Sequence, residues 1–163
     1  MKYEIERKFL VICDKFKEEA VNKFTIRQGY LSSGALNVIR VRTMNDKAFI
    51  TIKSNVRVIA RMEFEYEIPI EDANILLDRL CIKPVIEKRR YIIPYEGHTW
   101  EVDTFFGENE GLVFAEVELS ATFESVKSPP WVGKEVTGNP IYYNSNLREY
   151  PYRKWTEAEK AGI

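Results

Sequence analysis

The sequence predicts an α+β fold that is mainly β: a closed eight-stranded antiparallel β-barrel covered by a few helices. Three observations lead to this prediction. Eight short segments alternate apolar and polar residues with a period of two, which is typical of strands. Only two segments before Thr122 have helical periodicity. On seven of the eight predicted strands, charged side chains share one face and apolar side chains share the other.

Turn signals separate the predicted strands. Ser32-Ser33-Gly34, Asn45-Asp46, Glu96-Gly97 and the stretch Gly107–Gly111 each end one alternating segment and precede the next. Short connections of this kind are typical of antiparallel neighbours. The strands are predicted at Tyr3–Leu10, Thr25–Leu31, Leu36–Thr43, Ala48–Ser54, Arg61–Pro69, Pro84–Ile93, Thr99–Phe105 and Val113–Ser120.

Two helices are predicted, over Asp14–Phe24 with Asp14 as the N-cap and over Glu71–Leu80. Each presents an apolar stripe that can cover the apolar face of a sheet. After Thr122 the chain is irregular, with a possible closing helix at Tyr152–Ala161. The stripes consist of Phe16, Ala20 and Phe24 in the first helix and Ala73, Leu76, Leu77 and Leu80 in the second.

Length and composition narrow the class of protein. The 163 residues suit one domain with a real core, and 24 Lys and Arg against 25 Asp and Glu give a net charge of −1. This balance argues against a nucleic-acid binder recognised by bulk basicity. No apolar run approaches the roughly 20 residues of a membrane span, and the N-terminus lacks a signal peptide. Cys13 and Cys81 have no metal-ligand spacing, so we expect a cytoplasmic protein without membrane contact.

The charged faces of the strands carry most of the functional information. A solvated sheet face normally mixes its charges with Ser, Thr, Asn and Gln, whereas here nearly every same-face position is ionised and charges of one sign are grouped within each strand. These positions are Glu4, Glu6 and Lys8; Arg40 and Arg42; Thr51 and Lys53; Arg61, Glu63, Glu65 and Glu67; Lys88 and Arg90; Glu101 and Asp103; and Glu116 and Glu118.

Like charges two residues apart on a strand lie about 7 Å from each other and repel. This repulsion is relieved if the charged face lines a tunnel that holds a polyanion and metal ions. Carboxylate oxygens are ligands of Mg²⁺ and Mn²⁺, while Arg and Lys suit phosphate oxygens. A linear triphosphate carries about −4 to −5 charges, which several wall cations can neutralise. An ordinary solvated face is the alternative interpretation for any single strand.

Motifs along the chain resemble those of the CYTH superfamily, the triphosphate tunnel metalloenzymes. Glu4-Ile5-Glu6-Arg7-Lys8 is similar to that family's Glu-x-Glu-x-Lys signature. Later segments follow in the family's order, and the resemblance extends over about residues 1–150. They are Gln28-Gly29-Tyr30-Leu31, Arg40-Val41-Arg42, Thr51-Ile52-Lys53, Glu63-Phe64-Glu65, Lys88-Arg89-Arg90, Val102-Asp103-Thr104-Phe105, Gly111–Glu118 and Trp131–Thr137.

The resemblance implies a role for each matching residue. Residues 1–163 would form a single triphosphate tunnel domain, with about residues 122–163 as a lid or plug at one mouth. The carboxylates would hold Mg²⁺ or Mn²⁺, the cations would bind phosphates, and Lys8 or Lys88 would help to position or deprotonate the attacking water. The metal set is Glu4, Glu6, Glu116 and Glu118, with Glu63, Glu65 and Asp103 in or near it. The phosphate set is Lys8, Arg40, Arg42, Lys53, Lys88 and Arg90.

The expected activity is metal-dependent hydrolysis of a triphosphate, with inorganic tripolyphosphate as the leading substrate and orthophosphate as a product. Alternatives within the superfamily are adenylate cyclase, which makes cyclic AMP from ATP, and hydrolysis of thiamine triphosphate or nucleoside triphosphates. A polyphosphate-binding module is the alternative without catalysis. The partner is thus a small triphosphate-bearing molecule rather than a nucleic acid, and a homodimer is possible.

Overall fold

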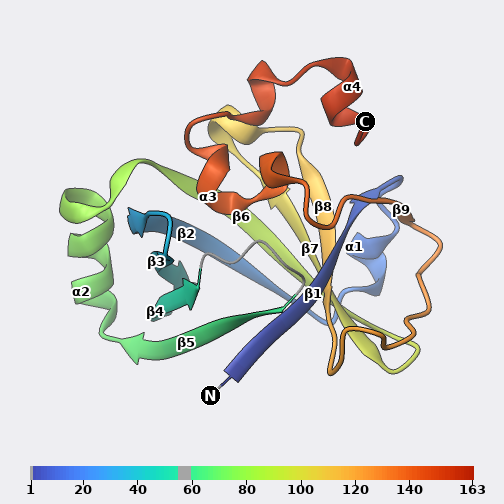
Figure 1. The fold of residues 1–163 in the computed structure, drawn as a ribbon, viewed down its shortest axis with the longest axis horizontal. Coiled ribbons are helices and arrows are strands. Elements are labelled where there is room, and N and C mark those ends of the chain that lie inside the picture. The colour runs from blue at the N-terminus through green and yellow to red at the C-terminus, as the bar shows by residue number, and fades with distance from the viewer. Residues whose placement is uncertain (1, 55–59) are drawn as a thin grey trace.

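The barrel is closed by a strand that pairs along both of its edges (Figure 1). The computed structural model describes residues 2–54 and 60–163. Within them the sheet order is β5-β4-β3-β2-β6-β7-β8-β1-β9, and a further pairing of β1 with β5 closes the first eight of these strands into an antiparallel barrel. The strands are β1 (Lys2–Val11), β2 (Asn22–Ser33), β3 (Asn37–Met44), β4 (Lys47–Ser54), β5 (Ala60–Ile68), β6 (Ile82–Tyr95), β7 (His98–Phe105), β8 (Val113–Glu118) and β9 (Val132–Glu135).

Strand β1 divides one of its edges between two partners. Its first residues, Lys2–Ile5, pair with β5, and its last residues pair with the short strand β9. Its other edge pairs with β8 along Glu6–Leu10. The predicted closed barrel of eight strands is confirmed, and β9 is an additional strand that the alternation pattern did not predict because its four residues are too few to show a period.

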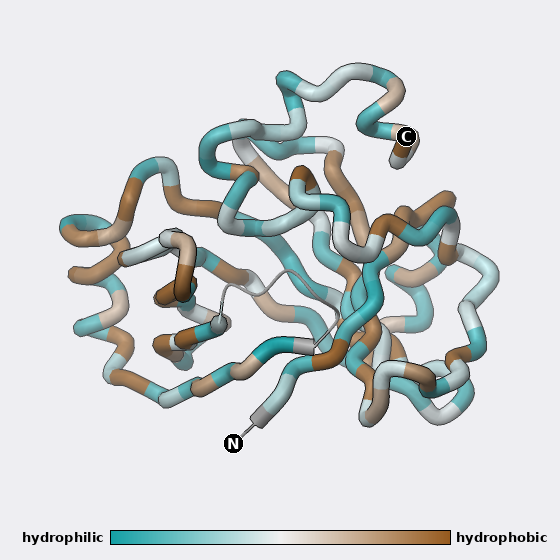
Figure 2. The backbone as a smooth tube through the Cα atoms, viewed as in Figure 1, coloured by the Kyte–Doolittle hydropathy of each residue, from teal (hydrophilic) through white to brown (hydrophobic). Residues whose placement is uncertain are grey.

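The helices α1 and α2 lie against two sides of the barrel (Figure 1), and a cluster of buried apolar side chains lies under each of them. Figure 2 shows that hydrophilic and hydrophobic residues alternate at short intervals along the strands, so each strand has an apolar face to bury. The helical elements are α1 (Phe16–Glu19), α2 (Ile70–Ile75), the π-helix η1 (Leu76–Leu80), η2 (Gly107–Asn109), η3 (Pro140–Tyr142), α3 (Asn144–Leu147), η4 (Tyr152–Lys154) and α4 (Glu157–Lys160).

The outer cluster under α1 is built from aromatic rings. Phe16 is fully buried, and its ring meets Tyr91 at 5.3 Å and Trp131 at 5.9 Å between centroids. Trp131 also meets Trp100 at 5.9 Å, and its indole Nε1 donates to Glu19 Oε2 at 2.8 Å. Edge-to-face pairs of this kind add to the stabilisation from burial, so this cluster fixes the outer faces of β6 and β7.

The first predicted helix is too long. Only Phe16–Glu19 is helical, and β2 already begins at Asn22, where it pairs with Ile92 of β6. Phe24, expected on the helix face, lies in β2 opposite Arg90. Asp14 is not the N-cap side chain, although its backbone oxygen accepts from the amide of Lys17. Strand pairing in the barrel outweighs the local helical pattern here.

The second predicted helix is present, as α2 followed directly by η1, and it covers β3 and β4. Ala73 and Leu77 are fully buried, but Leu80, which we expected on the same stripe, is 63% exposed. The π-turn of η1 has more residues per turn than an α-helix, so it rotates Leu80 away from the sheet.

The C-terminal segment lies over one end of the barrel (Figure 1). Tyr142, Leu147 and Trp155 are buried there against Phe105 and Phe114 of the strands. The closing helix expected at Tyr152–Ala161 is instead two short helices, η4 and α4, and the second is capped by a Thr156–Glu159 capping box. A lid function for residues 122–163, and their membership of one domain with residues 1–121, stay predictions.

Cys13 is exposed and Cys81 is buried, and both are free thiols. Across the described ranges 2–54 and 60–163, no helix is long and apolar enough to cross a membrane.

Gly29 of β2 provides a test of how closely α2 and η1 pack on the barrel. A Cβ added there would lie 2.8 Å from Cys81 Cβ and 3.1 Å from Leu77 Cδ2; Leu77 belongs to η1, Cys81 follows it, and both are buried. We expect Gly29→Ala to lower the free energy of unfolding by about 1–3 kcal/mol, because an overpacked core must shift. Urea unfolding measures this change. Gly34→Ala is the control, since its nearest neighbour would be 3.8 Å away; equal effects at both positions would contradict the packing described.

Candidate functional site

A charged cavity of about 810 Å³ occupies the interior of the barrel. All of the charged residues predicted as site residues line it except Asp103, which is 1% exposed and lies behind Lys88 and Arg90. The sequence pattern brings them together because alternate residues of every strand face inward. Cross-strand neighbours therefore share the interior: Lys8 with Glu116, Glu6 with Glu118, Lys53 with Glu63, and Arg90 with Asp103.

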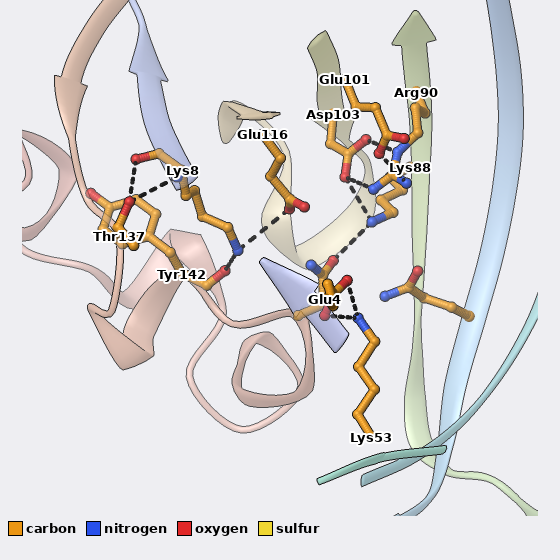
Figure 3. A network of polar contacts seen from close by, with 12 residues as sticks. Glu4, Lys8, Lys53, Lys88, Arg90, Glu101, Asp103, Glu116, Thr137 and Tyr142 are labelled. Atoms are coloured by element: carbon orange, nitrogen blue, oxygen red, sulfur yellow. Dashed lines mark hydrogen bonds and ion pairs between the residues drawn. The ribbon is translucent and has the colours of Figure 1, made fainter. Parts of the chain in front are cut away.

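The most deeply buried charges form one cluster on β6 and β7 (Figure 3). Lys88 Nζ donates to Asp103 Oδ2 at 2.7 Å, and Arg90 donates to both Asp103 oxygens at 2.7 and 2.8 Å. Burial would raise the pKa of Asp103, but the charges of Arg90 and Lys88 outweigh it and hold that pKa below its usual value. Burial also lowers the pKa of Lys88 to about 7, despite the opposing attraction of Asp103. Asp103 thus has both oxygens engaged by cations.

Glu4 forms a second ion-pair cluster near the β1–β5 closure. Lys53 Nζ donates to both of its oxygens, at 2.7 and 2.9 Å, and Arg61 Nε donates to Oε2 at 3.2 Å. Burial opposes ionisation of Glu4, yet Lys53 and Arg61 lower its pKa to about 2. Lys53 Nζ is also 3.4 Å from Glu63 Oε2. Arg61 therefore belongs to the cavity wall, although the sequence did not distinguish it from other charged positions.

Glu6, Glu116 and Glu118 form a carboxylate group with less compensation. Burial and the nearby charges of Glu116 and Glu4 raise the pKa of Glu6 well above its usual value. Glu116 is held ionised: burial opposes this, but Lys8, with its Nζ 3.5 Å away, and Arg90 lower its pKa. Two neighbouring carboxyl groups either share a proton or, when a cation lies between them, both ionise.

Arg40 and Arg42 form the cationic side of the wall on β3. Both guanidinium groups have an Nη2 3.6 Å from the same Glu65 oxygen, and neither Nε has a hydrogen-bond partner among the described residues. Burial and the positive charges of Arg40 and Arg90 lower the pKa of Arg42 to about 10. Glu65, predicted near the metal ligands, lies between these two arginines. The pair has donor capacity that suits an anion with several oxygens.

The C-terminal segment contributes to the same cavity. Lys8 Nζ donates to the backbone oxygen of Tyr142 at 2.9 Å (Figure 3), and Lys88 Nζ donates to Asn144 Oδ1 at 3.1 Å. Tyr143 and Asn144 line the cavity. Sequence reasoning missed these contacts because the segment has no periodic pattern that would orient its side chains.

His98 also lines the cavity. Its Nε2 lies 2.8 Å from Glu124 Oε1, and the other oxygen of Glu124 accepts from the amide and hydroxyl of Ser120. The Ser120 contacts and His98 lower the pKa of Glu124 to about 2. His98 is the first residue of β7, directly before the inward-facing positions Thr99, Glu101 and Asp103.

The donor set suits a hard divalent cation. Mg²⁺ and Mn²⁺ prefer carboxylate oxygens, and Glu6, Glu116 and Glu118 provide them with incomplete compensation by the protein's own cations. Within residues 2–54 and 60–163, however, no three His, Cys, Asp or Glu side chains converge closely enough to form a ready-made metal site. Mg²⁺ often uses only one or two protein carboxylates, together with water molecules and substrate oxygens.

Comparison with known proteins gives a consistent result. The sequence model of the CYTH domain family matches residues 2–148. An inorganic triphosphatase from Acetivibrio thermocellus is 51% identical over 154 residues, covering 94% of this chain and 98% of its own. An inorganic triphosphatase from Nitrosomonas europaea is 34% identical over 149 residues, covering 88% and 95%. A crystal structure of an inorganic triphosphatase superposes with a TM-score of 0.65 at 31% identity, covering 89% of this chain and 97% of that one.

Glu4 and Glu6, two residues apart on the same face of β1, should respond oppositely to loss of charge. The folded-state pKa of Glu6 is raised, so its ionisation above pH 4.5 costs stability that Glu6→Gln removes. The folded-state pKa of Glu4 is lowered to about 2, so its ionisation above pH 4.5 stabilises the fold, and this contribution is lost as the pH falls toward 2.

At pH 7 in excess chelator, we expect Glu4→Gln to lower the free energy of unfolding by roughly 1–3 kcal/mol. Glu6→Gln should leave it unchanged or raise it. Urea unfolding of the three proteins side by side measures both effects. Changes of the same sign in the two variants would contradict the electrostatic arrangement described.

Proposed function

The chain belongs to the CYTH domain family, and from this membership we propose that it is an inorganic triphosphatase that hydrolyses linear tripolyphosphate with Mg²⁺ or Mn²⁺. The observation that carries the proposal is the charge pattern of the barrel cavity. On one side, Glu6 and Glu116 lie close together with too little positive charge to neutralise both. On the other side, the Nε atoms of Arg40 and Arg42 have no hydrogen-bond partner among the described residues. A divalent cation would neutralise the carboxylates, and the phosphate oxygens of a triphosphate would accept hydrogen bonds from the arginines.

The phosphate chain would lie along the cations of the wall. Arg40 and Arg42 offer unpaired guanidinium donors, and Lys8, Lys53, Lys88 and Arg90 add positive charge from β1, β4 and β6. Phosphoryl transfer requires mainly positioning and neutralisation of charge, which such a wall provides. Asp103 acts here indirectly, because it holds Lys88 and Arg90 rather than a metal.

The divalent cation would be held by Glu6, Glu116 and Glu118, with Glu4 and Glu63 nearby, whereas Glu65 lies between Arg40 and Arg42. When bound, it would supply charge neutralisation for the phosphates. Hydrolysis joins the oxygen of a water molecule to the terminal phosphorus and breaks the adjacent P–O bond, giving orthophosphate and pyrophosphate. Lys88, with its pKa near 7, is suited to accept the proton of that water, and Lys8 lies nearby against Glu116.

Product analysis tests this function. We expect phosphate release from tripolyphosphate with Mg²⁺ or Mn²⁺, loss of release in excess EDTA, and lower turnover of ATP and thiamine triphosphate. Cyclic AMP formed from ATP would instead identify a cyclase. Binding of tripolyphosphate without release of phosphate would identify a binding module. The homodimer and the cytoplasmic location predicted from the sequence stay predictions.

Arg42 and Arg27 make a matched pair for testing phosphate binding. Arg42 lines the cavity, whereas Arg27 on β2 pairs with Asp78 on η1, its Nη2 2.8 Å from Oδ1. We expect Arg42→Ala to weaken tripolyphosphate binding by roughly 1.5–3 kcal/mol, a rise in KM of about 10- to 150-fold, because a charge-assisted contact is lost. Steady-state kinetics measures it. Arg27→Ala should change KM less than about twofold, and equal KM values for the two variants would contradict the assignment of Arg42.

A further inference from the structure

The C-terminal segment supplies a hydrogen-bond acceptor to each of the two lysines closest to the proposed chemistry. Tyr142 O accepts from Lys8 Nζ, and Asn144 Oδ1 accepts from Lys88 Nζ. Lys8 lies on β1 and Lys88 on β6, so a segment far along the chain contacts two separate strands of the barrel. A segment that only covered the mouth of the cavity would not need contacts to both amino groups.

The contact from Asn144 fixes the direction of the Lys88 amino group. Besides its bond to Cε, the Lys88 nitrogen has three tetrahedral positions: all three are N–H donors in the ammonium, whereas the neutral amine that can accept a proton has two N–H donors and one lone pair. Asp103 accepts from one N–H at 2.7 Å and Asn144 accepts from another at 3.1 Å. The third position on the nitrogen has no partner among residues 2–54 and 60–163, and Lys88 lines the cavity. With Asp103 alone, the group could rotate about its Cε–Nζ bond, whereas two acceptors on different elements define the third position.

The orientation of the Asn144 amide follows from the same contact. Lysine is only a donor, so the oxygen of the amide must face Lys88, and the amide nitrogen must face away from it. Asn144 itself is held by a well-anchored backbone. The amide of Asn146 donates to Tyr143 O at 2.9 Å, and the Asn146 side chain donates to Pro140 O at 2.8 Å. The buried Tyr142 ring packs against Phe114 and Trp155, and its hydroxyl donates to Glu159 O at 2.7 Å.

We propose that Asn144 is a positioning residue of the hydrolytic reaction, which orients the Lys88 amino group toward the attacking water. This inference rests on the proposed triphosphatase activity and extends its machinery to the C-terminal segment. Asn144 acts through Lys88, so its removal should impair the chemical step rather than the binding of the phosphate chain. Misplacement of a catalytic group by about 1 Å can cost on the order of 100-fold in rate.

The test compares two asparagines of the same short helix. Asn144→Ala and the similarly sized Asn144→Leu both remove the acceptor for Lys88, and we expect kcat on tripolyphosphate to fall about 10- to 100-fold with KM within about twofold. Asn146→Ala removes only the side-chain contact with Pro140 O; it keeps the backbone hydrogen bonds to Tyr143 O that hold Asn144 and does not touch Lys88, so kcat should stay within about twofold. Thermal melts of each variant establish that it is folded.

A double variant separates positioning from a general loosening of the segment. If Asn144 acts only through Lys88, Lys88→Ala with Asn144→Ala should be no slower than Lys88→Ala alone, because the two losses are not additive. Additive losses, wild-type kcat in both Asn144 variants, or an equal loss in Asn146→Ala would each overturn the proposal. A wild-type protein that releases no phosphate from any triphosphate would reject the proposed function, and the positioning role with it.

Discussion

Neutralisation of charge inside the barrel is the constraint on which the rest of the structure depends. Ionised side chains are stable away from water only when partners of opposite sign lie beside them. The register of the sheet supplies those partners: Arg90 lies opposite Asp103, Lys8 opposite Glu116, and Lys53 opposite Glu63. The apolar faces of the same strands must then be buried on the outside. The aromatic cluster around Trp100 and Trp131, and the helix pair α2 and η1, bury them. Interior electrostatics and exterior packing are therefore two results of one alternating sequence pattern.

The interior charges differ in how completely the protein itself compensates them. Asp103 is bound through both oxygens by two cations, and Glu4 is bound by Lys53 and Arg61, so these groups stabilise the barrel wall. Glu6 faces Glu116 with too little positive charge nearby, and Arg40 and Arg42 share a single carboxylate. The compensated groups maintain the wall, and the others are available to a ligand. The compensated groups therefore contribute to folding, and the unmet interactions contribute to the binding of a ligand that selects the folded state.

The strands, their faces and the main set of charged residues could be predicted from the sequence, because a period of two determines which residues share a side. The helix predicted to Phe24 was wrong since pairing of β2 with β6 begins at Asn22, a tertiary effect that local patterns do not contain. Strand β9 was missed for its shortness. The contacts of Tyr142 and Asn144 could not be predicted at all. One acceptor is a backbone carbonyl that any residue provides, and both lie in an irregular segment without periodicity. Likewise, the position of Glu65 between two arginines depends on the register between β3, β4 and β5.

The backbone acceptor for Lys8 has a consequence for how sequences of this type can diverge. A carbonyl group is the same in every amino acid, so the identity of residue 142 is constrained by the packing of its ring and not by its contact with Lys8. What must be kept is the spacing along the chain. Val136 is held by a backbone bond to Lys8 O, and Tyr142 and Asn144 follow at fixed separations to meet Lys8 and Lys88. Insertion or deletion of one residue between Val136 and Tyr142 would displace both acceptors together, and substitution is restricted at Gly138, with a φ of 79°, and at Asn139, whose side chain accepts from the amide of Ile141. The loop before α3 is therefore restrictive in length, the reverse of the usual behaviour of a surface connection.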